Sequence, residues 1–331
     1  MPTTGSEPQT DADTRAGGDE AVIQARGLVL HFGDLEVLRG LDLAVEPGTI
    51  YGFIGPSGSG KTTGVRALLG ALVPTAGEAR LLGEPPTALD ADTRARIGYM
   101  PQHNVLFPDL SLRQNLSFVA SIHGLPLRRR QRLRSLLAFL ELDAHRKKRL
   151  ADVSGGMQRR LALAAALVHE PEVLFLDEPT TGIDPVLRRR FWDHFAELRA
   201  QGRTVFVTTQ YVGEAAYCDR VAVLEAGRVT AEDSPEGLRR RAYGGDPLVL
   251  DFDEPPAPDV FAALREHPRV VRARQDEDPS RLRLVVDDGS RATVELPGWL
   301  QERGHVVRSA EPEAPPFDDV FVHLVEGERD A

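Results

Sequence analysis

The chain has 331 residues, with 40 Lys and Arg against 50 Asp and Glu, so its formal net charge is −10. The lone Cys218 excludes an intramolecular disulfide and is interpreted as an inert thiol, and the length suits two domains rather than a small stapled scaffold. No apolar run approaches the roughly 20 residues of a membrane-spanning helix, and the acidic balance argues against bulk nucleic-acid binding, so any anion site has to be local.

Residues 1–20 are polar and acidic, which predicts a disordered tail. They lack the basic start and the apolar core of a signal peptide. From there to about residue 240, strand-like and helix-like segments alternate. In 127–142 four leucines share one helical face, and the arginines opposite are interpreted as solvated surface. In this part, strands are expected at 22–32, 38–45 and 50–54, and helices from Thr62 and at 127–142.

Two continuously apolar segments, 173–176 and 205–209, are typical of parallel strands that are covered on both faces, and 185–200 between them predicts a helix. This alternation favours an α/β fold with a doubly wound sheet. After Ser234 the pattern changes, and Gly244 and Gly245 indicate a hinge. The sequence thus predicts a first domain over 21–240 and an accessory domain over 246–331, whose βαββαβ order suggests a ferredoxin-like α+β unit. In the accessory domain, strands are expected at 247–252, 269–274, 281–286 and 305–309, and helices at 258–267, 298–303 and 318–325.

A phosphate-binding loop is indicated where Gly55-Pro-Ser-Gly-Ser-Gly-Lys-Thr62 matches the pattern G-x-x-x-x-G-K-[ST] between a predicted strand and a predicted helix. Glycines let the backbone wrap a phosphate closely, Lys61 neutralises its charge, and the Thr62 hydroxyl can complete a Mg²⁺ shell. Gly64, inside the predicted helix, has no explanation in the sequence. The predicted nucleotide-binding residues here are Gly55, Pro56, Ser57, Gly58, Ser59, Gly60, Lys61, Thr62 and Thr63.

A second part of the same site is indicated where the apolar strand at 173–176 ends in Asp177 and Glu178. Asp177 is predicted to hold Mg²⁺ through water, and Glu178 to polarise an attacking water as the general base. The alternative is an acid pair that caps the turn at 179–182, and the presence of Lys61 makes it less favoured.

A third motif, Ser154-Gly-Gly-Met-Gln158, lies 23 residues before Asp177 and opens a predicted helix. With these motifs in this order, the chain resembles the ABC transporter ATPase family over about residues 22–227, although Val153 and Met157 replace the first and last residues of the usual Leu-Ser-Gly-Gly-Gln. The resemblance implies a P-loop cassette with a parallel core sheet, an antiparallel β subdomain and a helical subdomain. It also implies a head-to-tail homodimer, in which Ser154, Gly155 and Gly156 face the γ-phosphate held by the second subunit.

Three further positions match family positions, each with an alternative. Phe32 matches the aromatic residue that stacks on adenine, or it is a phenylalanine of the core or the meander. Gln102 matches the Q-loop glutamine, which senses Mg²⁺ and water and couples to the membrane partner, or it is a surface amide. Asp184 matches the D-loop at the dimer interface, and it is also placed to cap the helix that begins at Pro185.

One position departs from the family. Where the family usually has a histidine that contacts the γ-phosphate and the attacking water, this chain has Gln210, whose amide donates a hydrogen bond but carries no proton or positive charge. Slow but real hydrolysis is expected if Glu178 is the main base. The segment Thr208-Thr-Gln-Tyr211 and the Ser-Gly-Gly-Met signature resemble ATPases of the daunorubicin-type drug exporters, so the departure is interpreted as a subfamily feature.

The end of the chain, Pro315-Pro-Phe-Asp-Asp-Val-Phe-Val322, resembles the close of the extension in ATPases that drive type-two exporters, or it is a generic amphipathic helix. The resemblance implies an ATP-hydrolysing subunit that uses Mg²⁺ and powers export of a drug, lipid or other hydrophobic compound. It would act as a homodimer at the cytoplasmic face of the cell membrane, through a separate permease. Residues 109–127 are expected either to line a surface groove near Gln102 that receives a helix of the permease, or to pack in the core.

Three alternatives remain open at this stage. The first is an ABC importer ATPase. The second is a soluble ABC-type ATPase acting on ribosomes or DNA, which rests only on the basic runs at 128–134 and 146–149; no nucleic acid partner is expected. The third is a regulatory nucleotide-binding module with little turnover, which rests on Gln210.

Overall fold

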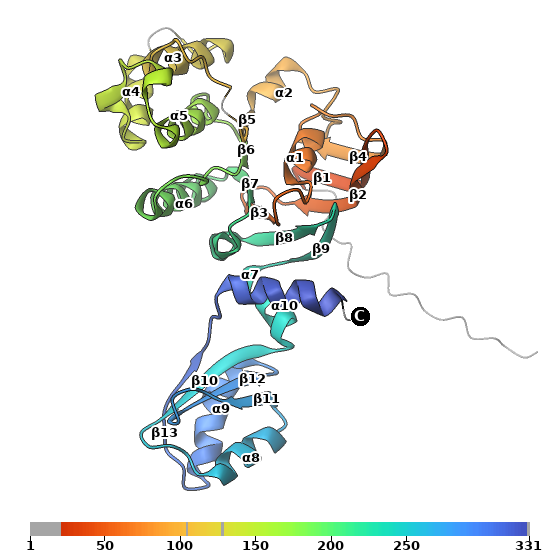
Figure 1. Ribbon diagram of the computed structural model, residues 1–331, viewed down its shortest axis with the longest axis vertical. Helices are drawn as coiled ribbons and strands as arrows, with labels where there is room; N and C mark the ends of the chain where they lie inside the picture. The colour runs from red at the N-terminus through yellow and green to blue at the C-terminus, as the bar shows by residue number, and fades with distance from the viewer. Residues whose placement is uncertain (1–20, 104, 127–128, 330–331) are drawn as a thin grey trace, which may run out of the picture.

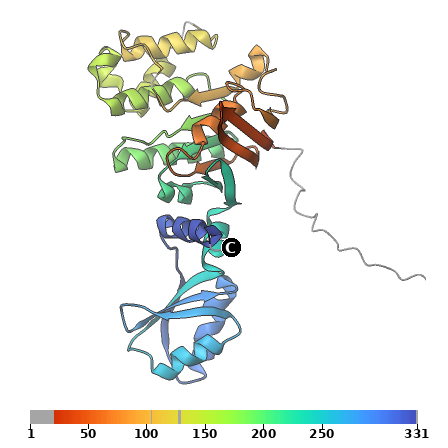
Figure 2. The same cartoon turned by 45° about the vertical axis from the view of Figure 1, so that its right-hand side comes forward.

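The computed structural model describes residues 21–103, 105–126 and 129–329, and within them three β-sheets form two lobes (Figures 1 and 2). The expected tail at 1–20 and the first two residues of the helix expected at 127–142 lie outside the described residues. No helix in the described ranges combines the length and the apolar character needed to cross a membrane.

The central sheet has the strand order β5-β6-β7-β3-β8-β9, with its first five strands parallel and β9 antiparallel at one edge. Its middle strands β6, β7 and β3 are buried along their whole length, which is why their sequences are continuously apolar. The predicted parallel core is therefore confirmed. The strands are β3 (Ile50–Ile54), β5 (Ile97–Met100), β6 (Val173–Asp177), β7 (Thr204–Thr209), β8 (Arg220–Glu225) and β9 (Arg228–Asp233).

The upper lobe in Figure 1 contains the central sheet and a second layer, which is an antiparallel sheet with the order β2-β1-β4. The predicted meander is confirmed, except that its second strand begins at Leu35, directly after a turn in which Gly33 takes a φ of 59°. The strands are β1 (Ile23–Phe32), β2 (Leu35–Val45) and β4 (Ala76–Leu81).

The helices of the upper lobe divide into those that flank the central sheet and a helical group at one end of the lobe, formed by α3, α4 and α5 (Figure 1). The helix expected at 127–142 is shorter, with α4 spanning only Arg130–Phe139. Its arginine-rich face is not wholly solvated, because Arg129 is 9% exposed and Arg132 donates to the carbonyl of Val168. The other helices are α1 (Lys61–Leu68), α2 (Ala91–Ala95), α3 (Leu112–Ile122), α5 (Gly155–Leu167), α6 (Pro185–Ala200) and α7 (Pro235–Tyr243), with 3-10 turns η1 (Asp143–His145), η2 (Leu150–Asp152) and η3 (Val212–Tyr217).

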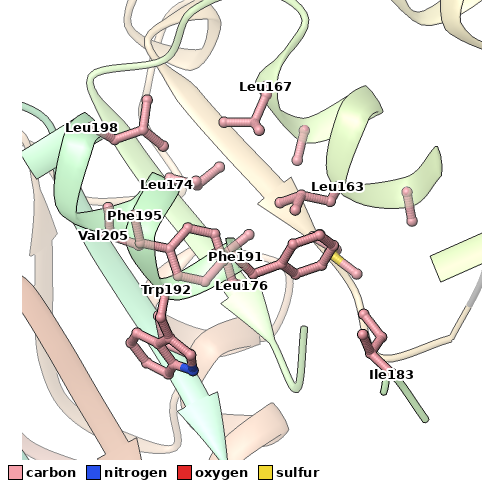
Figure 3. Packing of buried hydrophobic residues seen from close by; sticks show 14 of the residues in the cluster. Leu163, Leu167, Leu174, Leu176, Ile183, Phe191, Trp192, Phe195, Leu198 and Val205 are labelled. Carbon is pink, nitrogen blue, oxygen red and sulfur yellow. The ribbon is translucent and has the colours of Figure 1, made fainter. Parts of the chain in front are cut away.

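Alternation along the central strands sends side chains into two separate cores. Tyr51, Phe53 and Phe206 face α1 and the three-stranded sheet, whereas Leu176 and Val205 face α5 and α6. Figure 3 shows the second core, where leucines of α5 and large side chains of α6 meet the sheet. The contributing α6 residues are Phe191, Trp192, Phe195 and Leu198.

The lower lobe is a four-stranded antiparallel sheet in the order β11-β12-β10-β13. Two βαβ halves whose strands lie in this order form a ferredoxin-like unit, so the predicted α+β fold is confirmed. The second helix, α9, begins at Gly289, nine residues before the expected start at 298, because burial of its apolar face outweighs the loss of one N–H donor at Pro297. The elements are β10 (Asp246–Phe252), α8 (Pro258–Glu266), β11 (Val270–Gln275), β12 (Arg281–Val286), α9 (Gly289–Gln301) and β13 (Val307–Pro312).

The last helix, α10 (Phe317–Arg329), leaves the accessory sheet and lies between the two lobes (Figures 1 and 2). Its residues Phe317, Val320 and Leu324 are buried in the same apolar cluster as α5 and α6. The Arg239 guanidinium of α7 lies 4.8 Å from the centre of the Phe317 ring. The expected amphipathic character is thus present, and the buried face packs on the upper lobe.

Candidate functional site

The phosphate-binding loop joins β3 to α1. The Nζ atom of Lys61 donates to the carbonyl oxygens of Gly55 at 2.7 Å and Pro56 at 2.9 Å, and it lies 3.9 Å from Oε1 of Glu178. Burial lowers the pKa of Lys61, while the charge of Glu178 raises it. At Gly60, the N-cap of α1, no side chain caps the helix, so its first N–H groups are left for an anion.

Glycines are required in this segment for different reasons. A side chain at Gly55 would overlap the carbonyl oxygen of Leu224, and Gly60 takes a φ of 106°, which favours glycine. The structure also explains Gly64, because a Cβ there would lie 3.2 Å from the ring of Phe53. A glycine at this position lets α1 pack closely on β3.

Asp177 ends the buried strand β6 and is 0% exposed. Its Oδ1 accepts a hydrogen bond from the Thr208 hydroxyl at 2.5 Å, while its Oδ2 is buried and meets no hydrogen-bond donor within the described ranges. A buried carboxylate oxygen without a donor is costly unless a cation or a water completes its shell. The site therefore fits a hard cation such as Mg²⁺.

Glu178 follows with a φ of 51°, a left-handed conformation that costs a non-glycine residue about 1–3 kcal/mol. Its N–H meets both the carbonyl oxygen and the hydroxyl of Thr208 at 3.0 Å, and its Oε2 accepts from the Thr181 hydroxyl at 3.2 Å. The strained backbone is therefore held from β7, and the carboxylate is directed toward Lys61.

Arg159, on the second turn of α5, ties the loop after β5 to this strand end. Its guanidinium donates to the carbonyl oxygens of Pro101 at 3.1 Å and Asp177 at 2.5 Å, and also to those of Gln102 and Glu178. Burial lowers the pKa of Arg159, and the charges of Asp177 and Glu178 raise it. One half-buried side chain thus fixes the backbone of the acidic pair and of the loop that carries Gln102.

The two glutamines predicted for the site occupy loops at the same end of the sheet. Gln210 is exposed and follows Thr209, whose carbonyl oxygen accepts from the N–H of Gly55 at 3.3 Å. Because β7 lies between β6 and β3, Gln210 emerges between the acidic pair and the phosphate loop. Gln102 is half-buried after β5 and is held through its carbonyl by Arg159.

The other predicted residues lie outside this hydrogen-bond network. Phe32 is 51% exposed at the end of β1, so it is a residue of the meander and not of the core. Ser154 caps α5 by accepting from the N–H of Met157, and Asp184 caps α6 by accepting from the N–H of Leu187, as its alternative role predicted. Neither Phe32, Ser154 nor Asp184 has a hydrogen bond or ion pair with Lys61, Asp177 or Glu178 in the part of the chain that the structure describes.

Two residues of the site were not identified from the sequence, Thr208 and Arg159. The only signal for Thr208 was a hydroxyl residue at the end of a buried strand. The sequence showed Arg159 only as part of a helix. The carbonyl oxygens that accept from it lie in two segments that are far apart in the sequence, 101–102 and 177–178.

Comparison with known proteins identifies the family. The protein-family model described as "ABC transporter" matches residues 38–181 of this chain. The daunorubicin resistance ATP-binding protein DrrA3 of Streptomyces coeruleorubidus is 40% identical over 312 residues, covering 94% of this chain and 98% of the relative. The Nod factor export ATP-binding protein I of Burkholderia lata is 38% identical over 279 residues, covering 82% of this chain and 92% of the relative.

Solved structures show the same fold. One described as the ATP-binding subunit of an ABC transporter aligns with a TM-score of 0.62 and 26% identity, covering 67% of this chain and 93% of its own. A dimeric ATP-binding cassette in a post-hydrolysis state, bound to ADP and Pi, aligns with a TM-score of 0.59 and 26% identity. The alignment covers 64% of this chain and 98% of that structure's chain. The chain belongs to the ABC transporter family, as one of its ATP-hydrolysing ATP-binding proteins.

Proposed function

We propose that this ATPase powers export through a separate membrane permease, as a homodimer at the cytoplasmic face of the membrane. The names of its relatives, daunorubicin resistance and Nod factor export, support export over import. The daunorubicin-type likeness suggests a hydrophobic compound as cargo. The observation that carries the ATPase chemistry is the buried pair Asp177 and Glu178 beside Lys61.

In this proposal the phosphates of ATP lie on the free N–H groups of the phosphate-binding loop and of the first turn of α1, and Lys61 offsets their charge. Asp177, Thr62 and Gln102 would hold Mg²⁺, which when bound would neutralise charge on the phosphates. The exposed ring of Phe32 would stack on adenine.

Glu178 is proposed as the general base that accepts the proton of the attacking water. Its position beside Lys61 and its fixed, strained backbone support this role. Gln210 would donate an amide hydrogen bond to the γ-phosphate, which orients that phosphate without transferring a proton.

We further propose that a second copy completes the site, with Ser154, Gly155 and Gly156 reaching the γ-phosphate across the dimer and Asp184 lying at the interface. Both glycines have room around them, since a Cβ at Gly155 would meet nothing within 4 Å and one at Gly156 only the Gly182 carbonyl oxygen at 3.6 Å. An open, uncharged helix start suits an anion brought by another subunit. The dimeric neighbour bound to ADP and Pi supports this arrangement.

The proposed permease surface lies on the helical group. Within 109–127, Leu112 and Leu116 pack in the core, whereas Phe118 is 43% and Ile122 is 67% exposed. Phe107 lies against Phe118 with ring centres 5.0 Å apart. These exposed apolar side chains suit a helix of the permease. We also propose the division into a cassette over 21–240 and an accessory domain over 246–331, with α10 returning to the cassette.

The decisive experiment uses a Glu178→Gln variant. It should bind ATP, lose turnover by about 100-fold or more, and form an ATP-stabilised dimer in size-exclusion chromatography. Adding Ser154→Phe to this variant should abolish the dimer while leaving ATP binding to the monomer intact. Failure of the Glu178→Gln protein to dimerise with ATP at any concentration would contradict the dimer model.

The permease proposal is tested by copurification. A membrane protein encoded beside this chain should copurify with it, and replacing Phe118 and Ile122 by serine should weaken the complex without reducing basal ATPase activity. Replacing the exposed Val271 and Val294 of the accessory domain is the matched control. Stimulated turnover and substrate efflux in vesicles would then separate export from import.

A further inference from the structure

A cavity of about 740 Å³ lies in the helical group, between the first turn of α3, the start of α4 and the segment after η1. The fold brings there two basic runs that are separate in the sequence. The basic side chains that line it are Arg113, Arg129, Arg130, Arg134, Arg146 and Lys147, and no acidic side chain of the described ranges is part of its lining.

Most of this positive charge is not balanced. Arg146 pairs with Asp143 at 3.1 Å, and Arg134 approaches the same carboxylate at 4.0 Å. For the other four basic residues, no carboxylate of the described ranges lies at ion-pair distance. The cavity is thus a local region of positive charge in a chain whose net charge is −10.

Arg129 is the most deeply placed of these residues. It is 9% exposed, and within the described part of the chain its guanidinium donates only to neutral groups: the carbonyl oxygens of Leu125 at 2.6 Å and Ser117 at 2.8 Å, and the hydroxyls of Ser117 and Ser121. These contacts satisfy its donors and orient it, but they leave its charge uncompensated. A buried charge without a counter-charge is costly, and an anion in the cavity would offset that cost.

The start of α4 adds a second attraction for an anion. Arg129 is the N-cap residue of this ten-residue helix and makes no side-chain capping bond, and both Arg129 and Arg130 line the cavity, so the positive end of the helix dipole lies beside it. Arginine presents several N–H donors in a planar fork that matches phosphate oxygens.

We propose that this cavity binds a compact phosphate-bearing anion, which is either a soluble phosphorylated compound or a phospholipid headgroup. The volume lies in the range of small-molecule pockets and suits a compact group rather than a nucleic-acid duplex. The cavity shares no residue with the nucleotide site, so the proposal stands whether or not the exporter role does.

The test compares the full chain with a triple variant, Arg113→Gln, Arg130→Gln and Lys147→Gln. All three side chains are exposed and unpaired within the described ranges, so the fold should be retained. The matched control replaces Arg265, Arg272 and Arg274 of the accessory domain by glutamine, which removes the same charge elsewhere on exposed positions.

Two probes distinguish the sources of phosphate. Calorimetry with fructose 1,6-bisphosphate is run with the nucleotide site saturated by MgADP, and cosedimentation is run with phosphatidylcholine vesicles with and without phosphatidic acid. The wild type and the control should bind at least one probe in a salt-sensitive manner, and the triple variant should bind about tenfold or more weakly for each charge-assisted contact that it loses. Thermal unfolding and basal ATPase activity should be the same in all three proteins.

Binding of the sugar bisphosphate alone would assign a soluble ligand, and binding of the acidic vesicles alone would assign a headgroup. The proposal is overturned if the wild type binds neither probe, or if the triple variant binds as well as the control. Tighter binding of a DNA duplex than of either probe, lost in the triple variant, would overturn it in favour of a nucleic-acid site.

Discussion

The hydroxyl of Thr208 lies 2.5 Å from Oδ1 of Asp177, so the strand next to the acidic pair fixes the orientation of its first carboxylate. The same hydroxyl accepts from the N–H of Glu178 at 3.0 Å. Asp177 thereby keeps Oδ2 free of protein donors, and Glu178 is held in its left-handed conformation. A single side chain of β7 positions both acids, and it does so without touching the phosphate loop through any side-chain hydrogen bond in the described ranges.

Replacing Thr208 by the isosteric valine should lower kcat by about tenfold or more, because loss of a buried hydrogen bond of this kind costs about 1–3 kcal/mol and 1.4 kcal/mol is tenfold in rate. ATP affinity should change little, since the phosphate loop is intact. Thr204→Val is the control: it removes a hydroxyl that accepts from Gly48 N–H at the far end of the same strand. Equal kcat values for the two variants, measured at saturating MgATP, would contradict the positioning role.

Arg159→Lys should reduce kcat more than it reduces thermal stability. A lysine keeps the charge but cannot reach carbonyl oxygens in two loops with one planar fork, so the segments that carry Gln102 and Glu178 lose their common anchor. Arg160→Lys is the matched control, since Arg160 projects from a different face of the helix and donates to the Leu140 carbonyl, away from the acidic pair. The measurement is steady-state ATPase activity at saturating MgATP beside thermal unfolding. The role fails if both variants lose stability and kcat in the same proportion.

Gln210→His should raise turnover by about tenfold, because an imidazole can accept or donate a proton, whereas the amide forms hydrogen bonds without transferring a proton. Gln210 is exposed, so the substitution should leave the unfolding midpoint unchanged. The gain should disappear in the Glu178→Gln background if Glu178 is the main base. A Gln210→His protein that hydrolyses no faster would mean that glutamine costs this enzyme nothing.

The strands that carry the site could be predicted because buried parallel strands leave continuous apolar runs, and the residues proposed for catalysis follow those runs. The position of Lys61 after β3 and of Asp177 and Glu178 after β6 therefore required no knowledge of tertiary contacts. Arg159 could not be assigned in this way, since periodicity indicates which helical face is buried but not which carbonyl oxygens lie beneath it.

The same limit explains why the packing of α10, the start of α9 and the surroundings of Arg129 were not predicted. An amphipathic pattern predicted α10, but nothing in the sequence indicated that Phe317 would pack on the cassette rather than on the accessory sheet. For α9 the sequence predicted a helix only from residue 298, whereas the buried side chains of Ala292 and Leu296 belong to a helix that begins at Gly289. The arginines of 127–142 were interpreted as solvated, yet Arg129 is 9% exposed and its guanidinium donates to Ser117 and Ser121 of α3.

Acid should destabilise the cassette through a stacked histidine pair. The rings of His123 and His169 lie 3.6 Å apart, and Nε2 of His169 lies 3.0 Å from the carbonyl oxygen of Ile97. Burial lowers the pKa of His169 from 6.5 to about 4, and the nearby His123, Arg132 and Arg203 also disfavour its charged form. Burial lowers the pKa of His123 as well.

Because the folded-state pKa of His169 is depressed, the unfolded chain takes up this proton first as the pH falls. The contribution is fully present above about pH 6.5 and is lost progressively toward pH 4. Urea unfolding across this window should therefore show a smaller decline for His169→Gln than for the wild type. A His305→Gln change in the accessory domain is the control, and an unchanged slope in His169→Gln would contradict the assignment.

Phe317→Ala should destabilise the cassette although the residue lies at the far end of the chain. Phe317 is 5% exposed and belongs to the same apolar cluster as Trp192, so truncation should cost about 3–5 kcal/mol. The chain has two tryptophans, Trp192 in the cassette and Trp299 in the accessory domain. In a Trp299→Phe background, the fluorescence of Trp192 reports cassette unfolding alone, and its urea midpoint should fall. Phe261→Ala, which truncates a side chain packed on the accessory core, should leave that midpoint in place. If Phe317→Ala also leaves it in place, α10 contributes nothing to cassette stability.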